Sequence, residues 1–569
     1  MISFSWALRF LVFSVVLVGG CSLFSTSPSL PGGYLIPQKE PPSTPISRRV
    51  YLVADNQIHN LYNKPIPLLR TEFADKLVQS AIRPVQLDFY GQDFLEWLVR
   101  SRGQRTLFVH VGDAADFSCT GEFRRFVEIM GHAKKGWVLA PGNHEGFFLG
   151  NDHRDVANGD WPAGCSNAGK PMTKNQFVRL YLAALVLQKG PGYRTLARHL
   201  NLDGVEHTDL ERIAPLIPIE GDWRYGEMPG EDHPFLRAVS WRIDAVHPWR
   251  SFVVQELDLS RDPSRLLMPV TVRAILLDTA QYKQRPILLP PSRNAGLTGE
   301  LLDDQIAIVD SWIDSGPRES RFWLLIGHHP FDRLTPKAQD SVDALRKSAR
   351  ADLYVSAHTH AGQFIVHGKD STEENWLELN VGSILDWSLE FRPLQLSLTD
   401  DGERLLLRSP RYTMHEWLQE FEGVPLNDEE WEAKPGDLDY YLGHEDLKDL
   451  DAHDTEIRLK NVLLAAHGRL LLFNPTRMDA PPDAPFWPTC CASDETIFEE
   501  IERLIRDNRL NRKIEFLLEL GRFEADRPVE DPDRRRKFRL SQAIWASKYD
   551  SVHFRKPLKE DLFIIFPEE

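Results

Sequence analysis

The chain has 569 residues, more than one ordinary hydrophobic core uses, so there is room for two or three domains. Apolar residues make up 42% and charged residues 26%, which are the proportions of a globular protein rather than of a disordered one. The formal net charge of −16 argues against a general nucleic-acid-binding protein, because such a protein needs a basic face. A phosphorylated substrate is not excluded, since bound divalent metals can reverse the local field.

The first residues are typical of a targeting segment. An apolar run over residues 10–18 is too short to span a bilayer by itself. It leads into the letters VGGC at residues 18–21, which resemble a bacterial lipobox, where cleavage leaves Cys21 as a lipid-modified N-terminus. An ordinary signal peptide with an incidental Cys21 is the alternative. Residues 22–48 are rich in Ser, Thr and Pro and suit an extended tether.

These features predict a lipid-anchored protein of the bacterial cell envelope that faces the periplasm. Ser22 follows the cysteine, which by resemblance to lipoprotein sorting favours the outer membrane over the inner one. In that oxidising compartment Cys119 could pair with Cys165, although the sequence leaves the pairing open. The adjacent Cys490 and Cys491 are interpreted as structural.

From about residue 49 the chain alternates between short apolar runs and helical stretches. The runs are nearly continuous and of strand length, as expected for strands that are covered on both faces. They are Val50–Ala54, Leu107–Val111, Trp137–Ala140, Val272–Leu277, Trp323–Ile326 and Leu353–Ala357. Apolar stripes such as Phe94, Leu95, Leu98 and Val99 indicate helices between them. The pattern predicts an α/β layered fold.

Residues 49–399 are predicted to form the main domain. Residues 165–268 interrupt its alternation and are interpreted as an insertion over one end of the sheet, with a helix near 176–188 and strands near 237–243 and 251–257. Residues 400–569 are predicted to be a separate C-terminal α+β extension of unknown role, which could hold a protein partner.

Five of the apolar runs are followed directly by residue types that can bind metals. In an open α/β sheet the carboxyl ends of the strands converge on one crevice, so these side chains are aimed at one place. The segments are Asp55-Asn56-Gln57-Ile58-His59, Gly112-Asp113-Ala114-Ala115-Asp116, Gly142-Asn143-His144-Glu145, Gly327-His328-His329-Pro330 and His358-Thr359-His360. Each motif alone is compatible with a turn or a solvated loop. Their order and their shared position at strand ends favour a metal site.

This order of motifs resembles the calcineurin-like metallophosphoesterase superfamily. The resemblance covers roughly residues 49–399 and implies a four-layer α/β/β/α sandwich with a dinuclear site at the strand ends. It implies that Asp55 and His360 bind the first metal, that Asp113 bridges both metals, and that the second metal takes the remaining ligands. Those remaining ligands are Asn143, His328 and His358.

The resemblance also implies that His144 is the catalytic histidine and that Asp116 orients it. The chain departs from the family at the first motif, where Asp-x-His is usual and Gln57 stands two residues after Asp55. Some branches use Gln there, so Gln57 is preferred as a ligand over His59, and a neutral amide would soften that metal site. A second departure is Ala357, where Gly commonly precedes the His-x-His pair.

The expected chemistry is hydrolysis of phosphate mono- or diesters. Two divalent ions about 3.5–4 Å apart would hold a hydroxide that attacks phosphorus, while His144 protonates the leaving group. Nitrogen and oxygen ligands without thiolate suit manganese, iron or zinc. Two other readings are weighed: an envelope lipoprotein whose esterase domain is vestigial and serves as a binding or scaffold protein, and a metal-dependent hydrolase of non-phosphate esters.

Three neighbouring polar residues receive structural interpretations. His110 is expected to be a hydrogen-bonded core histidine and His329 to pack or face solvent. Glu145 is expected to be a carboxylate at the start of a helix rather than a catalytic group.

Overall fold

The computed structural model describes most of the residues of the predicted strand-end motifs, but not His59 or Asp116. The described residues are 34, 40–58, 85–115, 118–146, 172–203, 209–226, 235–261, 270–281, 298–314, 321–360, 362–368, 375–385, 390–400, 402, 404–413 and 563–566. The predicted lipobox, most of the tether, and Cys165, Cys490 and Cys491 lie outside them. Within these ranges no helix is both long enough and apolar enough to cross a bilayer.

The first β-sheet has the strand order β16-β14-β13-β2-β3-β4, and β1 and β15 also pair with β13. Its strands are β1 (Ser43–Pro45), β2 (Val50–Val53), β3 (Leu107–His110), β4 (Trp137–Leu139), β13 (Glu390–Thr399), β14 (Leu405–Arg408), β15 (Tyr412–Thr413) and β16 (Phe563–Ile565). β2, β3 and β4 run parallel to one another, so their carboxyl ends lie at the same edge of the sheet.

The second β-sheet has the order β11-β12-β10-β9-β8-β7-β6-β5. Its strands are β5 (Glu220–Arg224), β6 (Leu236–Arg242), β7 (Phe252–Asp258), β8 (Thr271–Leu276), β9 (Arg321–Ile326), β10 (Leu353–Ser356), β11 (Gln363–His367) and β12 (Trp376–Asn380). β8, β9, β10 and β12 are parallel neighbours, whereas β5, β6 and β7 add to the sheet in antiparallel pairs.

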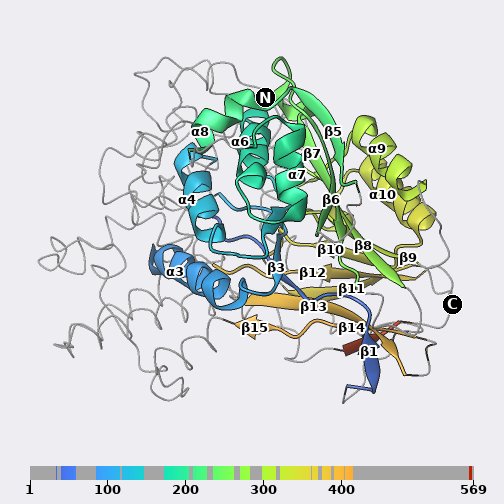
Figure 1. Cartoon of the computed structure of the whole chain (residues 1–569). Coiled ribbons are helices and arrows are strands. Elements are labelled where there is room, and N and C mark those ends of the chain that lie inside the picture. The colour runs from blue at the N-terminus through green and yellow to red at the C-terminus, as the bar shows by residue number, and fades with distance from the viewer. Residues whose placement is uncertain are drawn as a thin grey trace, which may run out of the picture.

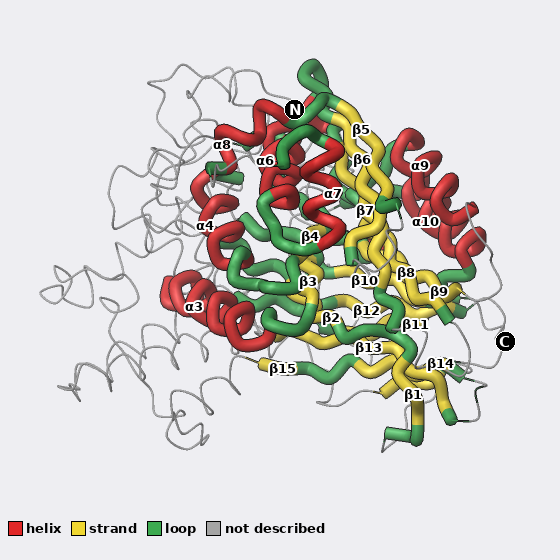
Figure 2. Tube along the Cα trace, in the orientation of Figure 1, coloured by secondary structure: helices red, strands yellow, loops and turns green. Residues whose placement is uncertain are grey.

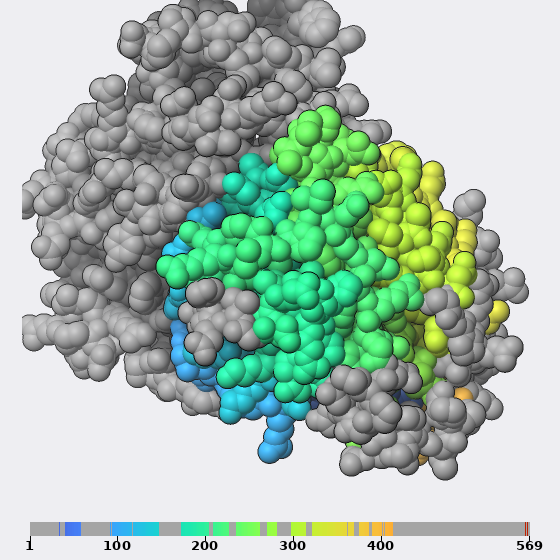
Figure 3. All heavy atoms as spheres, turned by 45° about the horizontal axis from the view of Figure 1, so that its top comes forward, coloured from blue at the N-terminus to red at the C-terminus, as the bar shows by residue number. Residues whose placement is uncertain are grey.

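Helices lie on both sides of the sheets, as Figures 1 and 2 show. They are α3 (Val85–Arg102), α4 (Thr120–Met130), α6 (Lys174–Val186), α7 (Pro191–His199), α8 (Leu210–Ile213), α9 (Asp303–Asp314) and α10 (Pro336–Ala349), with 3-10 turns at Ala214–Leu216, Pro248–Arg250 and Phe331–Arg333. α9 and α10 cover one face of the second sheet through a cluster that includes Trp312 and Val342. In the space-filling view of Figure 3, the green segments that include β5 and β6 lie beside these two helices.

The predicted α/β sandwich is confirmed. All six apolar runs form strands, and β2, β3, β4 and β10 are buried along their whole length. Complete burial explains why their sequences are continuously apolar rather than alternating. The predicted helix at 176–188 is α6, and the two predicted strands near it are β6 and β7, which extend the second sheet.

β14, β15 and β16 lie beyond residue 399 and pair into the first sheet. Phe566, directly after β16, contacts the ring of Tyr34 at a centroid distance of 5.7 Å and that of Phe322 in β9 at 6.1 Å. The division into a main domain, an insertion and a C-terminal extension stays a prediction, because residues 414–562 lie outside the described part.

Buried side chains join the edge of the first sheet to the second. The Leu139 N–H in β4 donates to Tyr181 Oη at 2.8 Å, and that hydroxyl donates to Gln255 Oε1 in β7 at 2.7 Å. Gln255 Nε2 in turn donates to the Leu139 carbonyl at 2.9 Å. All three residues are buried, so the N–H and the carbonyl of Leu139 at the edge of β4 are hydrogen-bonded without another strand.

Helix α6 is fixed to the second sheet by a buried ion pair. Lys174 Nζ, at the start of α6, lies 2.9 Å from Asp278 Oδ1, just after β8, and both side chains are fully buried. Asp278 also accepts the N–H groups of Ala280 and Val253. Burial raises the pKa of the Asp278 carboxyl, and the Lys174 ammonium counteracts part of that rise.

Replacing Lys174 by Met, which keeps the length of the side chain, leaves Asp278 buried without its counterion. We expect K174M to lower the free energy of unfolding by about 3–5 kcal/mol in urea denaturation followed by tryptophan fluorescence. The control is K337M, which removes an exposed pair with Asp303 and is expected to change stability by less than about 0.5 kcal/mol. Equal, small losses in both variants would contradict the role assigned to the buried pair.

Candidate metal centre

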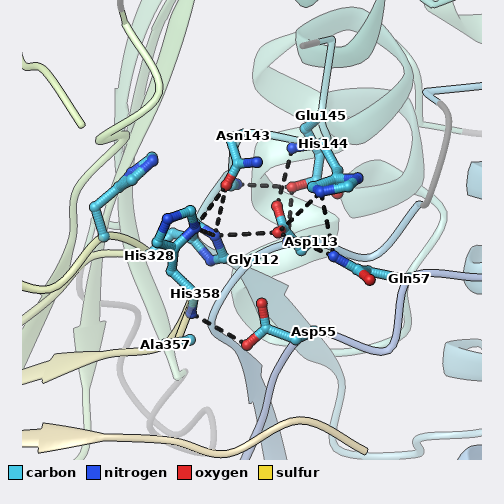
Figure 4. Close-up of polar contacts among 12 residues, drawn as sticks. Asp55, Gln57, Gly112, Asp113, Asn143, His144, Glu145, His328, Ala357 and His358 are labelled. Carbon is cyan, nitrogen blue, oxygen red and sulfur yellow. Dashed lines mark hydrogen bonds and ion pairs between the residues drawn. The ribbon is translucent and has the colours of Figure 1, made fainter. Parts of the chain in front are cut away.

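Residues from the two sheets meet where the carboxyl ends of their strands face each other. The first sheet contributes Asp55 after β2, Asp113 after β3 and Asn143 after β4. The second sheet contributes His328 after β9 and, after β10, His358 and His360. Figure 4 shows the side chains of Asp55, Asp113, Asn143, His328 and His358 turned toward one another. The structure therefore brings these six predicted residues together.

One group of side chains surrounds the imidazole of His328. Its Nε2 lies 3.0 Å from Asn143 Oδ1, 3.2 Å from His358 Nδ1 and 3.2 Å from Asp113 Oδ2. His358 Nδ1 is also 2.9 Å from Asn143 Oδ1. The ligand atoms of Asp113, His328 and His358 lie within 4.8 Å of one another, a spacing that could hold a metal ion.

A second group surrounds the carboxylate of Asp55. His360 Nε2 lies 3.4 Å from Asp55 Oδ1, and the His358 N–H donates to Asp55 Oδ2 at 3.2 Å. The ligand atoms of Asp55, Asp113 and His360 again lie within 4.8 Å of one another. Asp113 belongs to both groups, which is the arrangement that a bridging carboxylate requires.

The donor atoms of these two groups fit cations. The Nδ1 of His328 faces the Val111 carbonyl at 2.7 Å, so Nδ1 carries a proton there and Nε2 faces the cluster, where it could bind a metal once it is deprotonated. Asp55 Oδ1 is buried and has no hydrogen-bond partner. Carboxylate, amide and imidazole acceptors repel one another when they are packed this closely, and a cation between them removes the repulsion.

In the protein without bound metal, a proton on His328 supplies part of the positive charge that separates these acceptors. Burial by itself would lower the pKa of His328, but the Asp113 carboxylate, which also forms a hydrogen bond with it, raises the pKa to about 9. Burial opposes ionisation of Asp113, yet His328 and His144 hold its pKa well below the usual value. Asp55 has a pKa raised to about 6, chiefly because it is buried, although His360 acts in the other direction.

The turns that carry the site are strained. Five residues at the strand ends have positive φ angles: Asp55 at 49°, Gln57 at 34°, Asp113 at 58°, His358 at 69° and His360 at 58°. Such conformations cost about 1–3 kcal/mol each and persist where the surroundings impose them. Asp and His tolerate the left-handed region better than branched residues do, so these residue types suit both the backbone and the cations.

Two glycines make room for the central residues. Gly112 has a φ of 96°, and a Cβ there would lie 2.4 Å from His328 Nδ1. A Cβ on Gly142 would lie 2.2 Å from Asp113 Oδ1. Both distances are far below van der Waals contact, so any side chain at either position would displace a candidate ligand.

Glu145 has a role that the sequence did not indicate. It lies buried in a turn, and residues 147–171, where the predicted helix could begin, lie outside the described residues. Its Oε1 accepts the N–H groups of Ala114 at 2.7 Å and Ala115 at 3.2 Å. Its Oε2 accepts those of Asp113 at 2.9 Å and Gly142 at 2.7 Å. One carboxylate thus fixes the two loops that present Asp113 and Asn143.

His144 stands beside the metal-ligand candidates rather than among them. Its N–H donates to Asp113 Oδ1 at 2.9 Å, and its ring Nε2 lies 3.7 Å from Asp113 Oδ2 and 3.2 Å from Gln57 Nε2. The His144 side chain is 14% exposed, whereas that of Asp113 is 1% exposed, so the ring can reach a molecule bound in front of the cluster. Asp116, the predicted orienting residue, lies outside the described residues.

Gln57 also faces the cluster. Its Nε2 lies 3.5 Å from Asp113 Oδ2, and rotating the amide by half a turn would bring Oε1 to the same side. A metal would take that oxygen, since the amide nitrogen has no available lone pair. His59, the alternative ligand, lies outside the described residues.

The two neighbouring histidines are packed in the protein interior. His110 is buried, bonds through Nε2 to Asn56 Oδ1 and accepts the Gly112 N–H, as expected for a core histidine. Burial lowers the pKa of His110 to about 3, which keeps the ring neutral. His329 is buried too, with Nδ1 2.8 Å from Thr279 Oγ1.

Cys119 is disulfide-bonded, whereas Cys165, its predicted partner, lies outside the described residues.

Several supporting residues were missed at the level of sequence. Ser383 Oγ donates to the Asp55 carbonyl at 2.8 Å, and Asn380 Nδ2 donates to the Ala357 carbonyl at 2.7 Å. Both follow or end β12, so the same strand-end pattern could have found them. Ser118, which bonds to the His144 carbonyl and accepts the Gly146 N–H, follows no strand and gave no signal.

Glu145 offers a direct test of how the loops are held. We expect E145Q to weaken Mn²⁺ binding by about 10–100-fold in calorimetric titrations, because the amide puts a donor where the carboxylate accepts backbone N–H groups. The control is E122Q: Glu122 is also buried and accepts the Cys119 N–H at 3.2 Å, a contact that the Gln oxygen can keep. Unchanged Mn²⁺ affinity in E145Q would refute the positioning role.

The chain was compared with protein families, curated proteins and solved structures, and part of it matches one family. Residues 50–242 match the family model of the calcineurin-like phosphoesterases. No curated protein matches the chain. Among solved structures, "GAP50 the anchor in the inner membrane complex of Plasmodium" is 11% identical, with a TM-score of 0.27 and coverage of 64% of this chain and 84% of that one, a likeness too weak to support an argument.

The matched residues include Asp55, Asp113, Asn143 and His144. The fold brings His328, His358 and His360, which lie beyond residue 242, next to them. Residues 50–242 therefore match a calcineurin-like phosphoesterase domain.

Proposed function

We propose that this protein is a dinuclear metal-dependent hydrolase of phosphate mono- or diesters. The phosphoesterase domain and the candidate ligand groups support a metal-dependent phosphoesterase in general. The observation that carries the dinuclear proposal is that two three-residue ligand groups share Asp113. A shared carboxylate between two ligand sets is what a pair of ions needs in order to lie side by side.

Each ligand group would hold one ion. Asp55, His360 and Gln57 would bind the first, and Asn143, His328 and His358 the second, with Asp113 between them. Two bound divalent ions, manganese, iron or zinc, would supply Lewis acidity toward phosphate oxygens and would lower the pKa of the attacking water. The polypeptide keeps the ligands fixed through Glu145 and through the Val111 carbonyl that orients His328.

His144 is proposed to protonate the leaving alkoxide. Its backbone is tied to Asp113 Oδ1, and its partly exposed ring lies next to the cluster, so a leaving-group oxygen could meet a ring nitrogen at hydrogen-bond distance. Asp116 is proposed to orient the ring. Imidazole suits this task because it exchanges protons near neutral pH.

The cellular setting is part of the proposal. A lipid anchor at Cys21 and an extended tether would hold the domain at the bacterial envelope, facing the periplasm, where it would meet phosphate esters outside the cytoplasm. The residues beyond 400 are proposed to contact a protein partner there. The apolar run at residues 10–18 and the Ser- and Pro-rich segment after Cys21 support this setting.

Asn143 tests the second ligand group. We expect N143A to lose at least about 100-fold in turnover of an aryl phosphate with Mn²⁺, because the amide oxygen that lies 2.9–3.0 Å from both His358 and His328 is gone. Metal analysis should find one ion fewer per chain. The matched control is N201G, in an exposed turn whose φ of 56° glycine adopts freely. Full turnover in N143A would overturn the ligand assignment, and wild-type protein with neither turnover nor metal would favour the scaffold reading.

His144 tests the proton donor. We expect H144Q to bind both ions but to lower kcat on an alkyl phosphate by about 10²–10⁴-fold, since a poor leaving group needs protonation. The loss on a 4-nitrophenyl ester, whose leaving group needs little protonation, should be much smaller. H199Q, a change on the exposed end of α7, serves as the control. Equal losses on both esters would exclude His144 as the acid.

A further inference from the structure

The edge of the first sheet opposite the metal centre carries a different set of charges. Arg48 lies two residues before β2, Arg105 two residues before β3, and Lys135 two residues before β4. Because these three strands are parallel, equivalent positions before each strand lie at the same, amino-terminal edge. Four residues of strand at about 3.3 Å each separate this edge from the metal centre by on the order of 13 Å or more.

These three cations line a cavity of about 370 Å³ together with Lys134 and Lys189. The other lining residues are Gly190, Pro191, Gly192, Tyr193, Phe235 and Leu236. Five cationic side chains thus converge from four loops, and none of the described residues that line the cavity is acidic. Such a concentration is unexpected on a chain whose formal net charge is −16.

Several exposed cations elsewhere on the described surface have acidic partners. Arg124 pairs with Glu211, and Lys337 pairs with Asp303. Within the ranges that the structure describes, no ion pair joins an acid to Arg105, Lys134, Lys135 or Lys189. Their charges therefore add up instead of being cancelled at the surface.

Hydrogen bonds and a cation–π contact hold parts of the cavity wall in place. Arg48 Nε donates to the Ser260 carbonyl at 2.9 Å, and its guanidinium lies 4.6 Å from the centroid of the Phe235 ring. The Lys135 N–H donates to the Gly103 carbonyl at 3.3 Å, which brings the loop before β4 next to the loop before β3. These contacts fix the backbone while leaving the ammonium groups available.

Helix α7 directs its first turn into the same cavity. Its N-cap is Gly190, which offers no side-chain cap, and Pro191 and Gly192 follow at the cavity wall. The positive end of a nine-residue helix adds to the field of the lysines. Gly136 allows this approach: its φ is 88°, and a Cβ there would lie 2.6 Å from Tyr193 Oη.

We propose that this cavity is a second anion site, separate from the metal centre, that binds a phosphate-bearing group with at least two negative charges. Lysines act as point charges for phosphate oxygens, and a cavity of about 370 Å³ can hold a diphosphate or a phosphorylated headgroup. The group has two sources: a soluble phosphorylated molecule, or an anionic lipid headgroup in the membrane toward which the predicted tether leads from residue 48.

The first experiment is a titration of the full-length protein with inorganic tripolyphosphate in EDTA, which removes phosphate binding at metal ions. We expect K134E/K135E to bind at least about tenfold more weakly than wild type, because two exposed cations become anions. The control is K337E/K347E, the same change of charge on the exposed face of α10, and its affinity should stay within about twofold. Absence of binding by wild type, together with absence of the vesicle binding described next, would overturn the proposal, as would equal weakening in the two variants.

The second experiment separates the sources by sedimentation with vesicles. If a lipid headgroup is the ligand, adding phosphatidylglycerol to phosphatidylcholine vesicles will raise the retention of wild type and of K337E/K347E but not that of K134E/K135E. The proposed anchor at Cys21 adds the same retention to all three proteins, so only the increase over pure phosphatidylcholine is compared. Tripolyphosphate binding without that increase assigns the site to a soluble phosphate. An increase that is identical in the three proteins overturns the lipid assignment. Thermal unfolding of each variant establishes that the fold is intact.

Discussion

The carboxylate of Asp113 belongs to both candidate ligand groups, and its burial is the constraint that the surrounding structure has to satisfy. Imidazole, amide and carboxylate groups from four other chain segments lie within a few ångströms of it, with little access to water. Acceptors held this closely must be separated by positive charge. In the protein alone that charge is the proton on His328, and the same space suits a pair of metal ions.

The two sheets make different contributions to this centre. The first sheet supplies oxygen ligands, from Asp55, Asp113 and Asn143, and the second supplies the imidazoles. Neither sheet alone could form either ligand group, so the site exists only when the sheets are docked. The hydrogen bonds of Tyr181 and Gln255 between β4 and β7 help to hold that arrangement. Metal binding and sheet docking should therefore stabilise each other.

The buried strands and most of the candidate ligands at their ends could be predicted from the sequence. Buried parallel strands must be continuously apolar, so their ends are visible where Asp55, Asp113 and His328 interrupt the pattern. The resemblance to a known family then supplied roles for these residues. The role of Glu145 was missed because a carboxylate after Asn-His looks the same in sequence whether or not it also accepts N–H groups from two loops. The basic cavity was invisible because its cations come from four loops that are adjacent only in the folded chain.

The position of β16 in the sequence affects the order in which the first sheet can form during synthesis. Residues 563–565 pair with β14, and Phe566 packs on Tyr34 near the other end of the chain and on Phe322 of the second sheet. During synthesis on the ribosome, β14 emerges long before its neighbour exists, so its outer edge stays open while residues 414–562 are translated. The sheet that carries Asp55 and Asp113 thus reaches its final width only when these late residues return to close it.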